Sequence, residues 1–163
     1  MVGRLDGRTV VVLLGEGFED LEFWVPVMRL REEGATVTVA GLVPGVPVTG
    51  KNGLVTEAEV AIDDVDAEPL DALLVPGGWA PDKLRRYPSV TSLVKRVHDR
   101  GAIVGMICHA GLIGISAGIV AGGPRACEGA IPRRWQRWSD GWMVARWWSS
   151  WARASRTSSS GFR

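Results

Sequence analysis

Hydrophobic residues in the first 123 positions alternate between short runs of strand length and longer stretches with helical spacing. The runs at 9–14, 36–40, 72–75 and 102–107 predict strands, and the stretches at 19–33, 88–100 and 109–117 predict helices. Strands that alternate with helices in this way favour an α/β fold, a mostly parallel sheet with helices on both faces. The run at 9–14 is continuously apolar, as expected for a strand that is buried on both sides.

The two longer helical stretches differ in their pattern. In 88–100 the apolar residues that should face inward are Val90, Leu93, Val94 and Val97. In 19–33 the residues that recur at helical spacing are Leu21, Trp24, Val25, Met28 and Leu30. Gly34 supplies the stop of this helix, and Pro26 is expected to bend or restart it.

Glycine-rich turns follow several of the predicted strands. Gly50-Lys51-Asn52-Gly53 lies between two short apolar runs, and its Asn-Gly pair predicts a hairpin, which we expect at an edge of the sheet. Three buried strands end near Gly15, Pro76 and Ile107. In parallel sheets these carboxyl ends meet at one edge, where such folds bind their ligands.

Composition narrows the class of protein. With 46% hydrophobic and 23% charged residues the chain resembles a globular protein, and no apolar run approaches the roughly 20 residues of a membrane span. Nothing at the start of the sequence suggests an export signal. The two cysteines, Cys108 and Cys127, lie in very different contexts, so a disulfide framework is not expected and a reducing cytoplasm fits.

Cys108 is the strongest candidate for chemistry. It stands between a buried strand and a helix, where backbone N–H groups and the helix dipole favour a thiolate. The small neighbours Gly105, Ala110 and Gly111 suit a tight nucleophile elbow. The alternative is an inert core cysteine at a strand end.

Three neighbours of the elbow have two interpretations each. His109 can accept a proton, donate its backbone N–H to an oxyanion, or merely cap the helix. Gly77 and Gly78 can offer a second backbone N–H to an oxyanion, or simply form a turn. Glu19, on the first strand-to-helix connection, can donate a hydrogen bond to the thiolate when it is protonated; its spacing alone favours an ordinary helix N-cap.

Other kinds of site are not supported. Gly15-Glu16-Gly17 lacks the third glycine of a dinucleotide-binding turn, since Asp20 stands in its place. With only His98 and His109 and no Cys-x-x-Cys pair, no metal site is evident, and no cofactor is expected. The acidic residues within 57–71 are typical of an exposed loop or strand edge.

Over residues 8–121 the sequence resembles the PfpI-type intracellular cysteine peptidases of the ThiJ/PfpI superfamily. The resemblance is carried by the segments Glu16-Gly17-Phe18-Glu19-Asp20, Leu30-Arg31-Glu32-Glu33-Gly34, Pro76-Gly77-Gly78-Trp79-Ala80-Pro81-Asp82, Ile107-Cys108-His109-Ala110-Gly111 and Ile115-Ser116-Ala117-Gly118. It implies a flavodoxin-like three-layer α/β sandwich, related to class I glutamine amidotransferases, with the nucleophile elbow at Cys108.

The resemblance also implies roles for individual residues. Cys108 would be the nucleophile, His109 its neighbouring base and Glu19 the carboxyl that hydrogen-bonds the thiol. The third catalytic group would come from an adjacent subunit, at the position of Asp82, where relatives usually carry Glu. Asp is one methylene shorter, so its reach to His109 is in question. If that pairing holds, activity requires a homo-oligomer, a dimer or a hexamer built from dimers.

Members of this superfamily are described as peptidases, as glutathione-independent glyoxalases, as deglycases of methylglyoxal adducts, and as stress or chaperone-like proteins. Thiolate attack on a carbonyl carbon is common to the enzymatic roles. The alternative is a non-enzymatic redox sensor that works through oxidation of Cys108. Amidotransferase activity is excluded because it needs a downstream histidine, and none follows His109.

Residues 124–163 differ from the rest of the chain. They hold 8 basic and 2 acidic residues, 6 of the 8 tryptophans and 7 serines, without a helix or strand period. We therefore expect a domain at 1–123 that is incomplete at its C-terminal end, followed by a tail that a frameshift would explain. A tail that binds RNA or anionic membrane is the alternative, although neither nucleic acid nor membrane is an expected partner.

Overall fold

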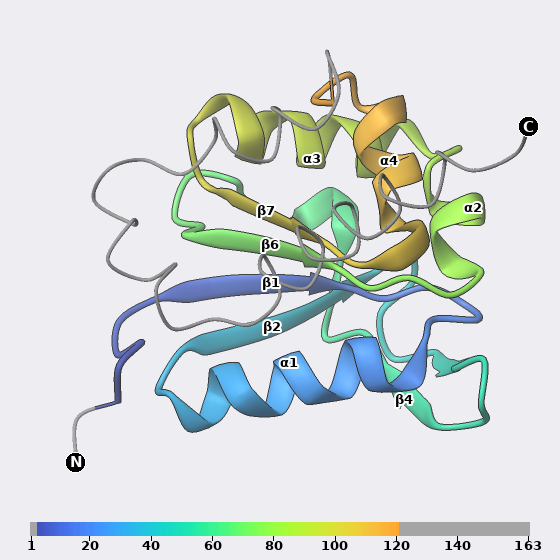
Figure 1. Cartoon of the computed structure of the whole chain (residues 1–163), viewed down its shortest axis with the longest axis horizontal. Coiled ribbons are helices and arrows are strands. Elements are labelled where there is room, and N and C mark those ends of the chain that lie inside the picture. Colours follow the sequence, from blue (N-terminus) through green and yellow to red (C-terminus); the bar gives the residue numbers. More distant parts are fainter. Residues whose placement is uncertain (1–2, 121–163) are drawn as a thin grey trace, which may run out of the picture. The chain divides into compact units, whose positions relative to one another are not determined.

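A computed structural model describes residues 3–120, and these form an α/β sandwich around a five-stranded sheet (Figure 1). The strand order is β5-β2-β1-β6-β7, and every neighbouring pair is parallel. The strands are β1 (Thr9–Leu13), β2 (Thr36–Gly41), β5 (Val60–Ala61), β6 (Ala72–Val75) and β7 (Ile103–Met106). The predicted fold class and its four strands are thus confirmed, and β5 is an additional short strand within the acidic segment 57–71.

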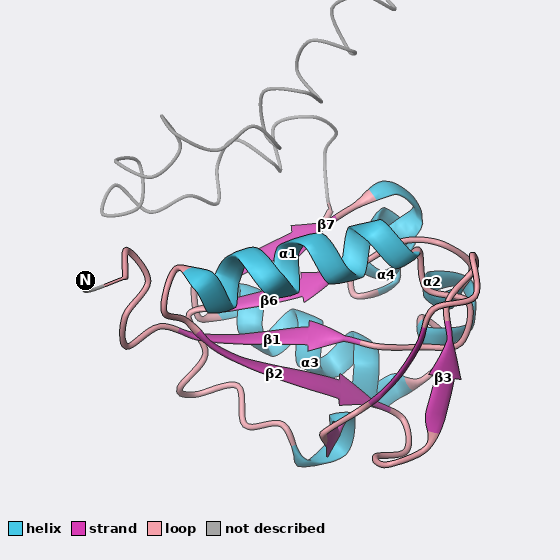
Figure 2. Ribbon diagram, turned by 90° about the horizontal axis from the view of Figure 1, so that it is seen from below, coloured by secondary structure: helices cyan, strands magenta, loops and turns pink. Residues whose placement is uncertain are grey.

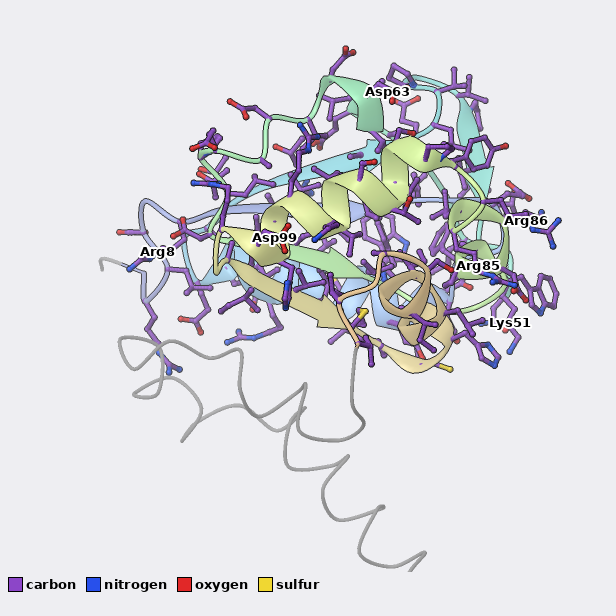
Figure 3. All side chains as sticks on the ribbon, turned by 90° about the horizontal axis from the view of Figure 1, so that it is seen from above. Arg8, Lys51, Asp63, Arg85, Arg86 and Asp99 are labelled. Atoms are coloured by element: carbon purple, nitrogen blue, oxygen red, sulfur yellow. The ribbon has the colours of Figure 1, made fainter. Side chains whose placement is uncertain are left out.

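Helices cover both faces of the sheet. Helix α1 (Asp20–Glu32) lies in front of the strands in Figure 2, whereas α3 (Pro88–Asp99) and α4 (Gly111–Ser116) lie in front in the opposite view of Figure 3. The shorter helical segments are η1 (Ile62–Asp64), α2 (Ala80–Leu84) and η2 (Cys108–Ala110). The pattern of apolar residues predicts the three long helices but not α2, which has only five residues.

The main core lies between the sheet and α3. Four α3 residues are fully buried, as predicted: Val90, Leu93, Val94 and Val97. Leu73 and Val75 of β6 are also fully buried. Strand β1 lies at the centre of the sheet, and Val10 to Leu13 are all buried, which agrees with a strand that is covered on both faces.

Helix α1 has the predicted bounds to within one residue, but its buried face is not the one that the apolar spacing indicates. Phe23 and Val27 are fully buried. By contrast Leu21, Val25 and Met28 are 66%, 48% and 51% exposed. The helix is therefore apolar on two sides, and the more regular of its two apolar stripes points away from the core.

The hairpin at 47–57 is present but does not lie at an edge of the main sheet. Strands β3 (Pro47–Thr49) and β4 (Val55–Glu57) pair with each other in a separate antiparallel sheet, and β5 forms the main edge instead. The loop between them runs from Gly50 to Leu54, so it is longer than a two-residue Asn-Gly turn. An isolated hairpin is only marginally stable in water, so other contacts must hold this one in place.

Asp20 supplies those contacts. It is a buried charged side chain, 2% exposed, in the first turn of α1. Its Oδ2 accepts a 2.8 Å hydrogen bond from the Asn52 backbone N–H, and its Oδ1 accepts another of 2.8 Å from Leu54. A side chain on Gly50 would collide with this carboxylate, at 2.7 Å from an added Cβ. The tip of the hairpin is thus closed tightly around Asp20.

The predicted boundary at residue 123 and the tail at 124–163 lie outside the described residues.

Acid should release the hairpin tip, because its anchor is a carboxylate. Burial alone raises the pKa of Asp20, but the hydrogen bonds from Asn52 and Leu54 outweigh burial, so its pKa lies below the ordinary value. The stability that it contributes is therefore present above the ordinary carboxyl pKa, about 4, and is lost as the pH falls through the lowered value. We expect Asp20→Asn to lower the melting temperature at neutral pH, and the difference from wild type to shrink below about pH 4.

Melting curves of both proteins between pH 3 and 7 measure this, with the exposed Asp63→Asn as the control. A difference between wild type and Asp20→Asn that stays constant with pH contradicts the assignment.

Candidate functional site

Cys108 lies at a sharp turn between β7 and α4. Ile107 before it is extended, whereas Cys108 itself has a φ of +53° and begins the single turn η2. It is the one non-glycine residue with positive φ among residues 3–120. Such a backbone costs about 1–3 kcal/mol and persists only where neighbouring structure imposes it. The predicted elbow is thus present, and its thiol is exposed.

Gly77 lies directly against this turn. A Cβ added to Gly77 would lie 2.9 Å from Cys108 Cβ, 2.9 Å from the Ile107 carbonyl oxygen and 2.6 Å from Glu22 Oε2. The absence of a side chain therefore lets the β6–α2 loop approach the cysteine. The Gly77 N–H donates a 2.8 Å hydrogen bond to Glu22 Oε2. This bond occupies the N–H that the sequence suggested for an oxyanion.

Gly78 joins the loop after β6 to the loop after β1. Its φ is +82°, and an added Cβ would lie 2.4 Å from the Gly17 carbonyl oxygen. Hydrogen bonds on both sides close the contact: the Glu19 N–H donates to Gly77 O at 3.1 Å and the Trp79 N–H donates to Gly17 O at 2.8 Å. Gly78 thus has the structural role that was weighed for it. Its own N–H and that of His109 donate to no other residue within 3–120.

Glu19 is the N-cap of α1. Its Oε2 accepts hydrogen bonds from the backbone N–H groups of Leu21 and Glu22, at 3.0 and 3.1 Å. Its Oε1 accepts a 3.1 Å bond from Asn52 Nδ2. The capping interpretation is therefore correct, and the contacts of the described residues include none between Glu19 and the Cys108 thiol.

The carboxylate that reaches the cysteine loop belongs instead to Glu22, which the sequence did not single out. Glu22 follows Glu19 by three residues, so it lies one helical turn further into α1. A capping residue points back over its own N-terminus, whereas a residue in the first turn can project toward the neighbouring strand ends. The signal in the sequence was that spacing, because it assigns the two carboxylates different tasks.

His109 and Asp82 are both exposed, and the structure does not bring them together within one chain. Asp82 lies in α2, is 61% exposed at its side chain and pairs with Arg85, with 3.2 Å between Oδ1 and Nε. His109 has no ion pair within the described part of the chain. The proposed supply of Asp82 by an adjacent subunit stays a prediction.

The site edge also carries cationic side chains. In Figure 3, Lys51 of the hairpin tip lies near Arg85 and Arg86, which follow α2, while Arg8 lies at the opposite end of the molecule. The Lys51 N–H donates a 2.7 Å hydrogen bond to Phe18 O, so the hairpin tip borders the loop after β1. Across residues 3–120, no group of three His, Cys, Asp or Glu side chains could hold a metal ion, and no helix is long and apolar enough to cross a membrane.

Comparison with known proteins gives this geometry a family. The model of the DJ-1/PfpI family matches residues 8–135. The chain belongs to the DJ-1/PfpI family. This match includes all three strand-end loops and the Cys108 turn, so the resemblance that the sequence motifs indicated is confirmed.

Relatives within the family carry related names. "Deglycase TK1284" of Thermococcus kodakarensis is 41% identical over 113 residues, which are 69% of this chain and 68% of that protein. "Deglycase PfpI" of Pyrococcus furiosus is 36% identical over the same shares of both chains. A crystal structure from Anabaena variabilis, of a two-domain protein with DJ-1/ThiJ/PfpI-like and ferritin-like domains, matches with a TM-score of 0.70 at 29% identity. That match covers 76% of this chain but 38% of the other.

Gly77 should tolerate no side chain. We expect Gly77→Ala to displace the Cys108 turn, since the added methyl meets backbone and Cβ atoms at less than 3.0 Å. The consequence is a lower melting temperature and a change of at least severalfold in the rate at which a thiol reagent modifies Cys108. Gly111→Ala is the matched control, because an added Cβ there meets nothing within 4 Å. Equal behaviour of the two variants would contradict the packing described for Gly77.

Proposed function

We propose that the protein is a cysteine-dependent hydrolase that attacks carbonyl carbons, with deglycation of methylglyoxal adducts as its first candidate activity. The observation that carries the proposal is the exposed Cys108, held at φ +53° against Gly77 and Glu22. Backbone strain at an exposed nucleophile is typical of functional sites. The deglycase names of relatives at 36–41% identity favour the same chemistry.

The first step would be the same for an adduct, a free aldehyde or a peptide. The Cys108 sulfur forms a bond to the carbonyl carbon, the C=O π pair moves onto oxygen, and the thiol proton passes to the imidazole of His109. The substrates differ only in what leaves afterwards. Deglycase, glyoxalase and peptidase activities are therefore alternatives for one nucleophile, and no cofactor takes part in this scheme.

The oxyanion would be bound by backbone N–H groups. Those of Gly78 and His109 are the candidates, since neither has another acceptor within residues 3–120. The Gly77 N–H already donates to Glu22, so its proposed role becomes indirect: the bond positions the loop that Cys108 packs against. Glu22 thus takes over the positioning task that had been expected of Glu19.

The proposed enzyme would work in the cytoplasm as a homo-oligomer. An exposed reactive thiol persists best in a reducing compartment. Asp82 of a neighbouring subunit would then orient His109, for which its 61% exposed side chain is available. Its ion pair with Arg85 is a surface interaction and costs little to exchange.

A redox sensor is the second candidate, and the exposure of Cys108 favours it. Peroxide would oxidise the thiol to sulfenic acid and thereby alter the turn. The two functions separate on a peroxide titration followed by mass spectrometry, since a sensor gains oxygen at Cys108 at low dose and shows little turnover.

Turnover should depend on Cys108 and His109. We expect Cys108→Ser to abolish turnover and His109→Ala to reduce kcat by about 10²–10⁴-fold, the usual contribution of a general base. Rates on a methylglyoxal-modified amino acid, on methylglyoxal and on a small peptide, measured on one preparation, identify the reaction. If Cys108→Ser matches the wild type on all three, the hydrolase proposal fails.

Shared sites can be detected by mixing inactive variants. In a dimer of Cys108→Ser and Asp82→Asn chains, one of the two sites has both wild-type residues if Asp82 acts across the interface. Random mixing in equal amounts should therefore restore about a quarter of wild-type activity. Restoration requires that the subunits exchange, so the two chains are unfolded and refolded together. No recovery from two folded, mixed variants would place Asp82 outside the neighbouring site.

A further inference from the structure

The outer face of α1 carries a stripe of exposed apolar side chains. Leu21, Val25 and Met28 follow one another at spacings of four and three residues, so they lie on one side of the helix. Their exposed fractions of 66%, 48% and 51% are high for such residues. We call these three residues the α1 stripe.

The stripe is not needed to attach α1 to its own sheet. Phe23 and Val27 do that from the opposite side, and both are fully buried. A helix that is apolar all round is normally covered all round. Leu54 extends the patch beyond the helix: it is 51% exposed, and its N–H is bonded to Asp20, the residue that precedes Leu21. Contiguous apolar surface of this kind marks an interaction site.

The charges at the two ends of α1 indicate what covers the stripe. The first turn carries the carboxylates of Asp20 and Glu22, and the last turn carries Arg29 and Arg31. If a second α1 packs antiparallel, each acidic end lies beside the basic end of the other helix, and the two helix dipoles are opposed favourably. A parallel arrangement would place like charges together.

We propose that the α1 stripe is a homodimer interface, in which α1 packs antiparallel on α1 of a second copy about a two-fold axis. The stripe complements itself in that arrangement, as an isologous interface requires. Leu21 of one chain would face Met28 of the second copy, and Val25 would lie near the axis. The stripe spans seven residues, a length of about 10 Å, so the axis passes close to its middle.

This interface would border the cysteine site without being part of it. Leu21 lies between Asp20, which holds the hairpin tip, and Glu22, which binds the Gly77 N–H. A second copy on the stripe would therefore cover the outer side of the turn from which both carboxylates project. The proposal does not rest on catalysis, so it can hold or fail independently of the hydrolase assignment.

Sedimentation of the full chain tests the proposal. The wild type should have at least twice the chain mass of 17.6 kDa. Val25→Glu should halve that mass, because two carboxylates would meet at the axis. Val25 is half exposed, so the substitution should leave the monomer folded, which circular dichroism checks. Ile115→Glu is the matched control, since Ile115 is 62% exposed on α4, on the opposite side of the sheet.

A cross-link tests the geometry itself. In a background of Cys108→Ser and Cys127→Ser, Val25→Cys should form a disulfide-linked dimer on mild oxidation, whereas Ile115→Cys should stay monomeric. Support requires both the loss of mass with Val25→Glu and the Val25→Cys cross-link. A monomeric wild type, as expected if another segment of the same chain covers the stripe, overturns the proposal. So does an oligomer whose mass Val25→Glu leaves unchanged.

Discussion

The hydrogen bond from the Gly77 N–H to Glu22 Oε2 is the contact on which the arrangement of the site depends. It joins the first turn of α1 to the loop after β6, and that loop touches Cys108. A parallel sheet brings strand ends to one edge but does not fix the loops that leave them. Here a buffer of water between the loops is replaced by direct contact, since Gly77 and Gly78 leave no room for one.

The first turn of α1 acts as the common anchor for these loops. Glu19 caps the helix and binds Asn52, Asp20 holds the hairpin tip, and Glu22 holds Gly77. Three carboxylates at a helix N-terminus are each favoured by the helix dipole and by unpaired N–H groups. Because each one binds a different segment, the negative charges are used for positioning, and the strained backbone at Cys108 is held from a rigid support.

The fold could be predicted because its signals are local. Residues 9–14 and 72–75 are apolar runs too short for helices, and the inward positions of α3 follow from spacing alone. The cysteine turn could be found too, since small residues flank Cys108. The short helix α2 and strand β5 gave no comparable signal, because elements of five and two residues have no period to detect.

The assignment of carboxylates could not be settled from the sequence, because Glu19 and Glu22 differ only in which turn of the helix they occupy. A capping box and a side chain that reaches another loop use the same residue types. Distance in space decides between them: Glu19 is consumed by N–H groups two and three residues ahead, whereas Glu22 bonds to a residue 55 positions away. Such a pairing depends on the register of β1 against β6, which no local pattern encodes.

The buried face of α1 was misread for a related reason. Periodicity identifies an apolar stripe but not what covers it. Leu21, Val25 and Met28 form the more regular stripe, yet Phe23 and Val27 fill the core, since they are the residues that face the sheet once Asp20 is fixed inside the hairpin. The anchor at Asp20 thus sets the rotation of the helix about its axis. Once that rotation is set, Glu22 must project toward Gly77 and the regular stripe must face outward, so the geometry of the cysteine site and the exposed surface of α1 have one cause.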